Sequence, residues 1–174
     1  MTLKEAIQFI QPAIPKEKEV WADIGAGKGI FTLALDQLLL PESSIYALDK
    51  NINGLKGLRL QNAQLIVEAF DFNEHHHLPT LDGILMANTL HYSPNPKSVL
   101  KQLLKPLRPN GTFIFIEYEL NQPRGHWIPY PIPFQKFKAI AQQLPLTPPY
   151  EITRIPSVYG NNYMYLAKCL KVGA

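Results

Sequence analysis

Glycines recur at alternate positions directly after a short apolar run near the start of the chain. The run covers residues 20–22, and the glycines are Gly25, Gly27 and Gly29. Glycine permits a sharp turn and lets a ligand lie against bare backbone. The apolar pattern over residues 30–40 predicts a helix, whose unpaired N–H groups favour a carboxylate or phosphate at its start. The stretch is therefore typical of a strand, a turn and a helix that bind a ligand together.

Two aspartates accompany this turn. Asp23 stands just before the first glycine, and Asp49 ends a second apolar run over residues 44–48. Asp49 lies about 20 residues beyond the turn, where nucleotide-binding βαβ units place a carboxylate for the ribose hydroxyls. A ribose contact does not distinguish one nucleotide cofactor from another. Asp23 favours a ligand that carries an ammonium group, because its charge would repel a pyrophosphate.

The spacing Asp-x-Gly-x-Gly-x-Gly, with an acidic residue after the second strand, resembles the class I S-adenosylmethionine-dependent methyltransferases of the small-molecule type. The dinucleotide fingerprint Gly-x-Gly-x-x-Gly fits less well, because Ile30 occupies its last position. The resemblance covers nearly the whole chain. It implies an α/β, Rossmann-like fold: a seven-stranded, mostly parallel sheet of order 3-2-1-4-5-7-6, with the last strand antiparallel and helices on both faces.

Hydrophobic patterns along the chain agree with that fold. We expect helices over residues 3–10, 30–40, 96–107 and 134–144, with a weak one near 52–58, and strands over 20–22, 44–48, 64–70, 83–87, 112–117, 151–158 and 163–170. The link between the third and fourth strands is only long enough for a rudimentary helix. The last two strands are joined by a short link, which predicts a hairpin.

Composition places the chain among globular proteins. A length of 174 residues, 46% of them hydrophobic and 18% charged, predicts one domain over residues 1–174. The net charge of +3 comes from scattered residues and does not favour a nucleic acid partner. The single cysteine, Cys169, excludes an internal disulfide and a thiolate-built metal site.

The start of the chain lacks the apolar core of a signal peptide, and no apolar run is long enough to span a membrane. We expect a cytoplasmic protein with no membrane contact and leave its oligomeric state open.

The resemblance also assigns roles at the carboxyl ends of the strands. It implies that Asp23 and the glycine turn hold the methionine part of S-adenosylmethionine, that Asp49 holds the ribose, and that Asp71 meets the adenine amino group. The alternative for Asp71 is a capping or turn-forming residue. Asn88 begins the segment that flanks the sulfonium. The implied cofactor-binding residues are Asp23, Gly25, Ala26, Gly27, Gly29, Asp49, Lys50, Asp71, Phe72 and Asn88, and the product is S-adenosylhomocysteine.

The segment 88–92, Asn-Thr-Leu-His-Tyr, is similar to that of small-molecule methyltransferases. It lacks the Asn-Pro-Pro-Tyr pattern of enzymes that methylate exocyclic base nitrogens, so a nucleic acid acceptor is disfavoured. His91 is a candidate general base, because an imidazole exchanges protons near neutral pH. The alternative is that His91 packs or caps at the start of the next helix.

A proline-rich stretch over residues 121–133 begins at the carboxyl end of the fifth strand. Trp127 and Tyr130 in this stretch, and Phe134 directly after it, could belong to the core or to a wall of the substrate site. We favour the wall, because polyproline-like backbone holds aromatic rings stiffly. We also expect this loop to cover the bound cofactor. The predicted substrate-contacting residues are Tyr92, Tyr118, Trp127 and Tyr130.

The consecutive residues His75, His76 and His77 suggest zinc at first sight. In an extended loop, however, neighbouring side chains point in alternating directions and rarely converge on one ion, so a solvated loop is favoured. The Glu-Tyr-Glu sequence over residues 117–119 differs from the Asp-Asn pair of magnesium-dependent catechol-type enzymes. We expect no metal site.

These patterns predict an S-adenosylmethionine-dependent methyltransferase that acts on an unidentified small or medium-sized acceptor. The alternative is a module that binds S-adenosylmethionine or another nucleotide without turnover. A short-chain dehydrogenase fits poorly, because its Tyr-x-x-x-Lys pair is missing: Pro96 stands where the lysine after Tyr92 would be.

Overall fold

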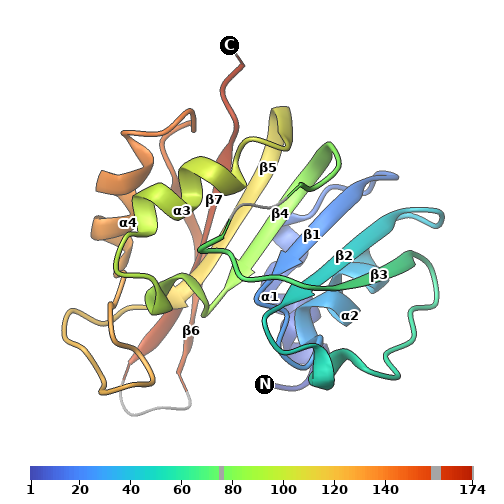
Figure 1. Ribbon diagram of the computed structural model, residues 1–174, viewed down its shortest axis with the longest axis horizontal. Helices are drawn as coiled ribbons and strands as arrows, with labels where there is room; N and C mark the ends of the chain where they lie inside the picture. Colours follow the sequence, from blue (N-terminus) through green and yellow to red (C-terminus); the bar gives the residue numbers. More distant parts are fainter. Residues whose placement is uncertain (75–76, 158–161, 174) are drawn as a thin grey trace.

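Seven strands form one central sheet with helices on both faces in the computed structural model, which describes residues 1–74, 77–157 and 162–173 (Figure 1). The strand order is β3-β2-β1-β4-β5-β7-β6. Strands β1 to β5 pair in parallel, whereas β7 runs antiparallel to both β5 and β6. The predicted order and the direction of the last strand are confirmed. The strands are β1 (Val20–Ile24), β2 (Ser44–Asp49), β3 (Gln64–Ala69), β4 (Leu81–Ala87), β5 (Leu107–Tyr118), β6 (Tyr150–Pro156) and β7 (Tyr163–Leu170).

The helices divide between the two faces of the sheet. Helices α1 (Leu3–Ile10) and α2 (Ile30–Leu38) pack into one apolar cluster, and α3 (Pro96–Leu103) and α4 (Phe134–Ala141) pack into another. In Figure 1 the first pair lies behind the sheet and α3 lies in front. Short 3₁₀ helices cover Gln11–Ala13 (η1), Ile52–Leu55 (η2) and Leu90–Tyr92 (η3). No helix within the described ranges has the length and apolarity needed to cross a membrane.

The central strands are buried on both faces because their side chains alternate between the two clusters. In β4, Ile84 and Met86 pack towards α3 and α4, whereas Leu85 and Ala87 pack towards α1 and α2. A parallel strand covered on both sides reads as a continuous apolar run, as β4 does. This burial fixes the positions of the strand ends, and the polar residues that follow those ends form the candidate site.

Several predicted boundaries were wrong. The helix expected over 96–107 ends at Leu103, and Leu107 instead begins β5, because Pro106 prevents the helix from continuing. The helices expected to reach residues 40 and 144 end at Leu38 and Ala141. The weak helix near residue 52 is the 3₁₀ helix η2. The described part of β6 ends at Pro156, and residues 158–161, which include most of the predicted hairpin link, lie outside the described residues.

Candidate active site

The glycine turn joins β1 to α2 and is fastened to the end of β2. The N–H groups of Gly25 and Ala26 both donate to the carbonyl of Leu48, at 2.7 and 3.0 Å. Gly25 has a φ of +77°, and a Cβ at this position would lie 2.1 Å from Oγ1 of Thr89. Only glycine therefore lets the turn pack so closely against the loop that follows β4.

Asp49 is held beside this turn, as the sequence predicts. Its Oδ2 accepts a hydrogen bond from the N–H of Gly27 at 2.8 Å, and its Oδ1 accepts one from Asn51 at 2.8 Å. The carboxylate at the tip of β2 is thus placed by backbone donors on both sides. Such a fixed acceptor next to bare glycine backbone suits the hydroxyls of a ribose.

Lys50 and Asp71 join the tips of β2 and β3. The ammonium of Lys50 lies 2.7 Å from Oδ2 of Asp71, and the N–H of Asn73 donates to Oδ1 of Asp71 at 3.0 Å. The hydrogen bond from Lys50, followed by that from Asn73, lowers the pKa of Asp71 to about 2. The bond to Asn73 gives Asp71 the turn-forming role that was its alternative. Phe72 packs against the apolar cluster of α3 and α4. Contact of Asp71 or Phe72 with adenine stays a prediction.

Asp23 is buried beneath the glycine turn. Its side chain is 1% exposed, and Oδ2 accepts a hydrogen bond from the hydroxyl of Thr32 in the first turn of α2 at 2.6 Å. Burial raises the pKa of Asp23 from 3.8 to about 6, although the bonds from Thr32 oppose the rise. The predicted contact of Asp23 with a ligand ammonium is untested, but its buried negative charge lies under the turn that would receive such a ligand.

The raised pKa of Asp23 predicts how the free energy of unfolding depends on pH. The folded protein keeps the Asp23 proton up to about pH 6, whereas the unfolded chain releases it near pH 3.8, so the free energy of unfolding should fall as pH rises between these values. This difference between the pKa values of Asp23 in the folded and unfolded chain corresponds to about 3 kcal/mol. Asp23→Asn should remove this decline. Denaturant titrations of parent and variant below and above the window should differ by a pH-dependent amount, and a constant difference would contradict the prediction.

His91 lies in η3, directly after β4, and bonds to the end of β5. Its Nδ1 lies 2.8 and 2.9 Å from the two carboxylate oxygens of Glu117. The side chain of His91 is 2% exposed, and Glu117 is fully buried. Glu117 was not among the predicted site residues, although a charged residue at the end of the apolar run 113–116 is a signal that could have indicated it.

A cavity of about 630 Å³ lies beside this pair, at the carboxyl ends of β4 and β5. Most of its surface is apolar, and it is lined by Asn88, His91, Tyr92, Tyr118, Leu120, Arg124, Trp127 and Ile128. The structure therefore brings together Asn88 and His91 with three of the four predicted substrate-contacting residues. Leu120, Arg124 and Ile128 were not predicted, because nothing in their local sequence indicates that they face a cavity.

Tyr130 is the predicted substrate residue that does not line this cavity. Its side chain is 43% exposed, and its N–H donates to the carbonyl of His91 at 3.0 Å, so it fastens the loop to η3. Phe134 packs against the core and meets Tyr165 edge-on at 5.5 Å between ring centroids. Of the aromatic residues proposed for the wall, Trp127 takes that place and Phe134 belongs to the core.

A second cavity, of about 490 Å³, lies between the segment after β3 and the end of α3. Its lining residues include none of the predicted cofactor or substrate residues, and it is separate from the glycine turn. Within the described part of the chain, no three His, Cys, Asp or Glu side chains converge in a way that could hold a metal ion. His75 and His76, part of the rejected zinc interpretation, lie outside the described residues.

Comparison with known proteins identifies the class to which this fold and site belong. Residues 22–113 match a family described as a methyltransferase domain. Because this match spans more than half of the chain, the chain belongs to the methyltransferase-domain family, which confirms the class I methyltransferase predicted from the glycine motif. No curated protein sequence matches the chain.

Solved structures share the fold at low sequence identity. The chain is similar to 1,6-didemethyltoxoflavin-N1-methyltransferase from Burkholderia thailandensis, solved with 1,6-didemethyltoxoflavin and S-adenosylhomocysteine, at 19% identity and a TM-score of 0.77 over 98% of this chain and 78% of that one. It is also similar to the YcgJ protein from Bacillus subtilis, at 13% identity and a TM-score of 0.73 over 98% and 100% of the two chains. A third similar structure is an S-adenosylmethionine-dependent methyltransferase from Aquifex aeolicus, at 18% identity and a TM-score of 0.69 over 97% and 90%.

Proposed function

We propose that this protein transfers a methyl group from S-adenosylmethionine to a small or medium-sized molecule bound in the cavity beside His91. One observation carries the proposal. The segment Asn88–Thr89 connects the two halves of the site: Thr89 packs on Gly25 of the glycine turn, and Asn88 lines the cavity. A cofactor on the turn and an acceptor in the cavity would therefore meet at this segment.

The residues of the chain would act mainly by alignment. S-adenosylmethionine supplies an activated methyl group on its sulfonium. Asp49 and the glycine turn would orient the cofactor, while the cavity walls hold the acceptor in line with the methyl group. Holding two reactants in near-attack geometry contributes about 7 to 11 kcal/mol to lowering a barrier, so alignment alone is a large effect.

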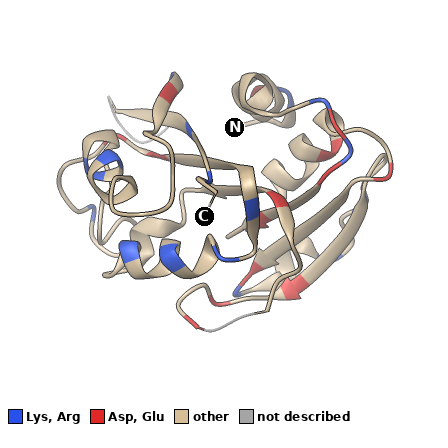
Figure 2. Ribbon diagram, turned by 90° about the horizontal axis from the view of Figure 1, so that it is seen from above, with Lys and Arg blue, Asp and Glu red and all other residues tan. Residues whose placement is uncertain are grey.

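A small-molecule acceptor suits both the charge distribution and the cavity. Lys and Arg residues are spread over several elements, and among the described residues they do not gather into one continuous basic face that would favour a nucleic acid (Figure 2). The related Burkholderia enzyme was solved with a small acceptor bound. We also propose a cytoplasmic location, because a chain with a single cysteine suits a reducing compartment.

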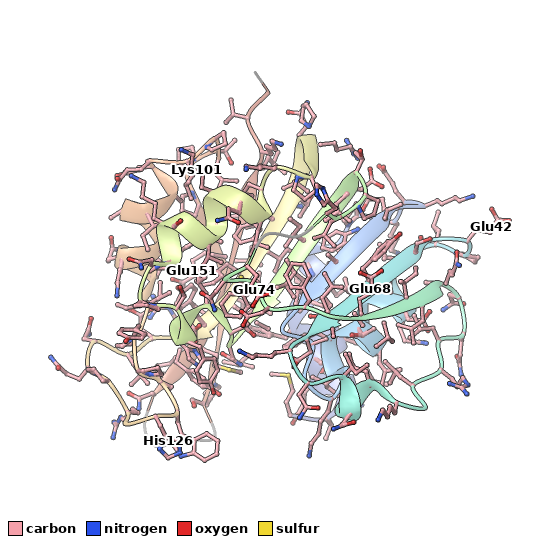
Figure 3. All side chains as sticks on the ribbon, viewed as in Figure 1. Glu42, Glu68, Glu74, Lys101, His126 and Glu151 are labelled. Carbon is pink, nitrogen blue, oxygen red and sulfur yellow. The ribbon has the colours of Figure 1, made fainter. Side chains whose placement is uncertain are left out.

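Asp49→Ala should weaken the binding of S-adenosylmethionine and S-adenosylhomocysteine by about 1.5 to 3 kcal/mol, because the lost carboxylate accepts charge-assisted hydrogen bonds from the ribose. Calorimetric titration measures this directly. Glu42→Gln is the matched control, because Glu42 precedes β2 at the opposite edge of the sheet and should not affect affinity (Figure 3). An unchanged dissociation constant in Asp49→Ala would contradict the proposed contact between Asp49 and the ribose.

Two further measurements test the proposed function itself. The parent protein should bind S-adenosylhomocysteine more tightly than NAD, and the reverse order would overturn the choice of cofactor. Transfer of a labelled methyl group to a component of a metabolite pool would demonstrate turnover. Tight cofactor binding without any transfer would instead indicate the non-catalytic binding module.

A further inference from the structure

Two polar atoms at the cavity lack hydrogen-bond partners although they are buried. They are Nε2 of His91 and Oδ1 of Asn88, and neither has a partner among the described residues. Both residues line the cavity of about 630 Å³. A buried polar atom without a partner costs about 1 to 3 kcal/mol, so such atoms tend to mark places where a ligand completes the hydrogen bonding.

The bond to Glu117 determines which hydrogen bonds these atoms can make. A carboxylate only accepts hydrogen bonds, so Nδ1 of His91 must carry the proton that lies between the two groups. In the neutral imidazole, Nε2 is then left with a lone pair and accepts. Oδ1 of Asn88 accepts as well, because its amide nitrogen faces the sulfur of Met164 at 3.3 Å. Both atoms therefore require a ligand that donates from O–H or N–H groups.

The walls of the cavity indicate the shape of that ligand. Tyr92, Tyr118 and Trp127 contribute aromatic rings, and the imidazole of His91 lies 4.4 and 6.2 Å from the centroids of the two tyrosine rings. Stacked or edge-on contacts with such rings favour a flat, unsaturated molecule. Arg124 adds a cation at the exposed rim, with no ion pair to a described residue, and would attract an anionic substituent.

We infer that the acceptor is a planar aromatic or heteroaromatic molecule with an acidic hydroxyl or ring N–H, and that Nε2 of His91 removes this proton while Glu117 acts as a positioning residue through Nδ1. This inference rests on the proposed function and names its substrate class. The half-exposed ring of Tyr92 lies against the imidazole and forms part of the wall of this cavity.

The step balances without any further reagent. A lone pair of the acceptor oxygen or nitrogen forms a bond to the methyl carbon as the carbon–sulfur bond breaks, and sulfur keeps the bonding pair. The acceptor proton passes to Nε2 of His91. The imidazolium is then paired with the buried carboxylate of Glu117 until the proton leaves to water. The other titratable or charged groups around this pair are Tyr92 from η3, Tyr118 from β5, Arg124 from the loop and Tyr165 from β7.

The test uses 4-nitrophenol as a probe, because its phenolate absorbs visible light and its neutral form does not. At a pH where the free probe is mainly neutral, binding to the parent protein should produce the phenolate band. His91→Asn and Glu117→Gln should bind the probe without the band. Glu119→Gln is the matched control, because Glu119 follows β5 but bonds to Phe134 and Arg154, and it should keep the band. The methyl ether 4-nitroanisole, which has no acidic proton, should bind more weakly.

A second variant avoids the buried pair. Trp127 is 68% exposed, so Trp127→Ala should fold normally and bind 4-nitrophenol about threefold to tenfold more weakly. Unchanged affinity for 4-nitrophenol in this variant would contradict the inference that aromatic side chains of the cavity bind the acceptor. A phenolate band that persists in His91→Asn, or that never forms in the parent, would contradict the role of His91 as the general base.

The outcomes separate this inference from the proposed function. If the parent binds S-adenosylhomocysteine but never ionises the probe, the inferred acceptor class and base are contradicted, whereas the proposed methyltransferase function is not. If the probe is ionised through His91 but S-adenosylhomocysteine does not bind, the proposed function fails, and the ligand class and the base are supported.

Discussion

His91→Asn is expected to lower turnover by about 100-fold to 10,000-fold while leaving cofactor affinity intact, because asparagine cannot take a proton from the acceptor. The acidic limb of the pH–rate profile should disappear with it. Steady-state kinetics over a range of pH, on an acceptor that responds to the parent, measure both effects. The geometry favours this result, since Glu117 fixes Nδ1, while Nε2 of the cavity-lining His91 is buried with no partner among the described residues.

A purely structural role for His91 predicts a different kinetic result. Removing the partner of a fully buried carboxylate should lower thermal stability in either case, so stability alone does not decide. If His91 is only structural, the pH–rate profile should keep its shape when assays are run well below the unfolding temperature. If the variant retains more than about a tenth of parental turnover, the loss of rate is too small for the removal of a general base.

Deleting residues 123–129 is expected to abolish methyl transfer while keeping cofactor affinity within about a few-fold. The deleted segment contains Arg124, Trp127 and Ile128, which form one wall of the cavity. Its loss should open the reacting centre to water and release the acceptor. The chain should close over the gap because the two ends of the deleted segment lie close together: Arg124 and Ile128, just inside those ends, are joined by a hydrogen bond of 3.0 Å in the parent. Labelled-methyl assays and calorimetry with S-adenosylhomocysteine measure the two effects.

His126→Ala provides the control for this deletion. His126 belongs to the same loop, is exposed, and is not among the residues that line the cavity; Figure 3 shows it at the outer end of the loop. The ring of His126 lies 4.9 Å from that of Trp127, so the variant should retain turnover within about a few-fold of the parent while the deletion abolishes it. Full activity in the deletion variant would show that the loop neither covers the cofactor nor holds the acceptor, and the cover would have to come from another segment.

The sequence alone determined the parts of this protein that depend on neighbouring residues. The glycine turn, the strand before it and the helix after it lie within one short stretch, where a left-handed φ and a sharp turn require glycine itself. Apolar runs of strand length and a short final link predicted the strands and the antiparallel last strand, whereas the order of the strands came from the resemblance to the methyltransferase family. Asp49 was found in the same way, because a βαβ unit fixes its distance from the turn.

Only the tertiary structure decided which distant residues join His91 at the cavity. Glu117 and His91 are 26 residues apart, and they meet because β4 and β5 pair in parallel and end at the same edge. The same holds for the loop residues Arg124 and Ile128, which line the same cavity as His91. Local spacing encodes a turn because the backbone there is nearly rigid, whereas a contact between distant segments depends on how the whole core packs. For this reason the glycine turn and several cavity-lining residues could be predicted from sequence, whereas the pairing of His91 with Glu117 and the positions of Arg124 and Ile128 could not.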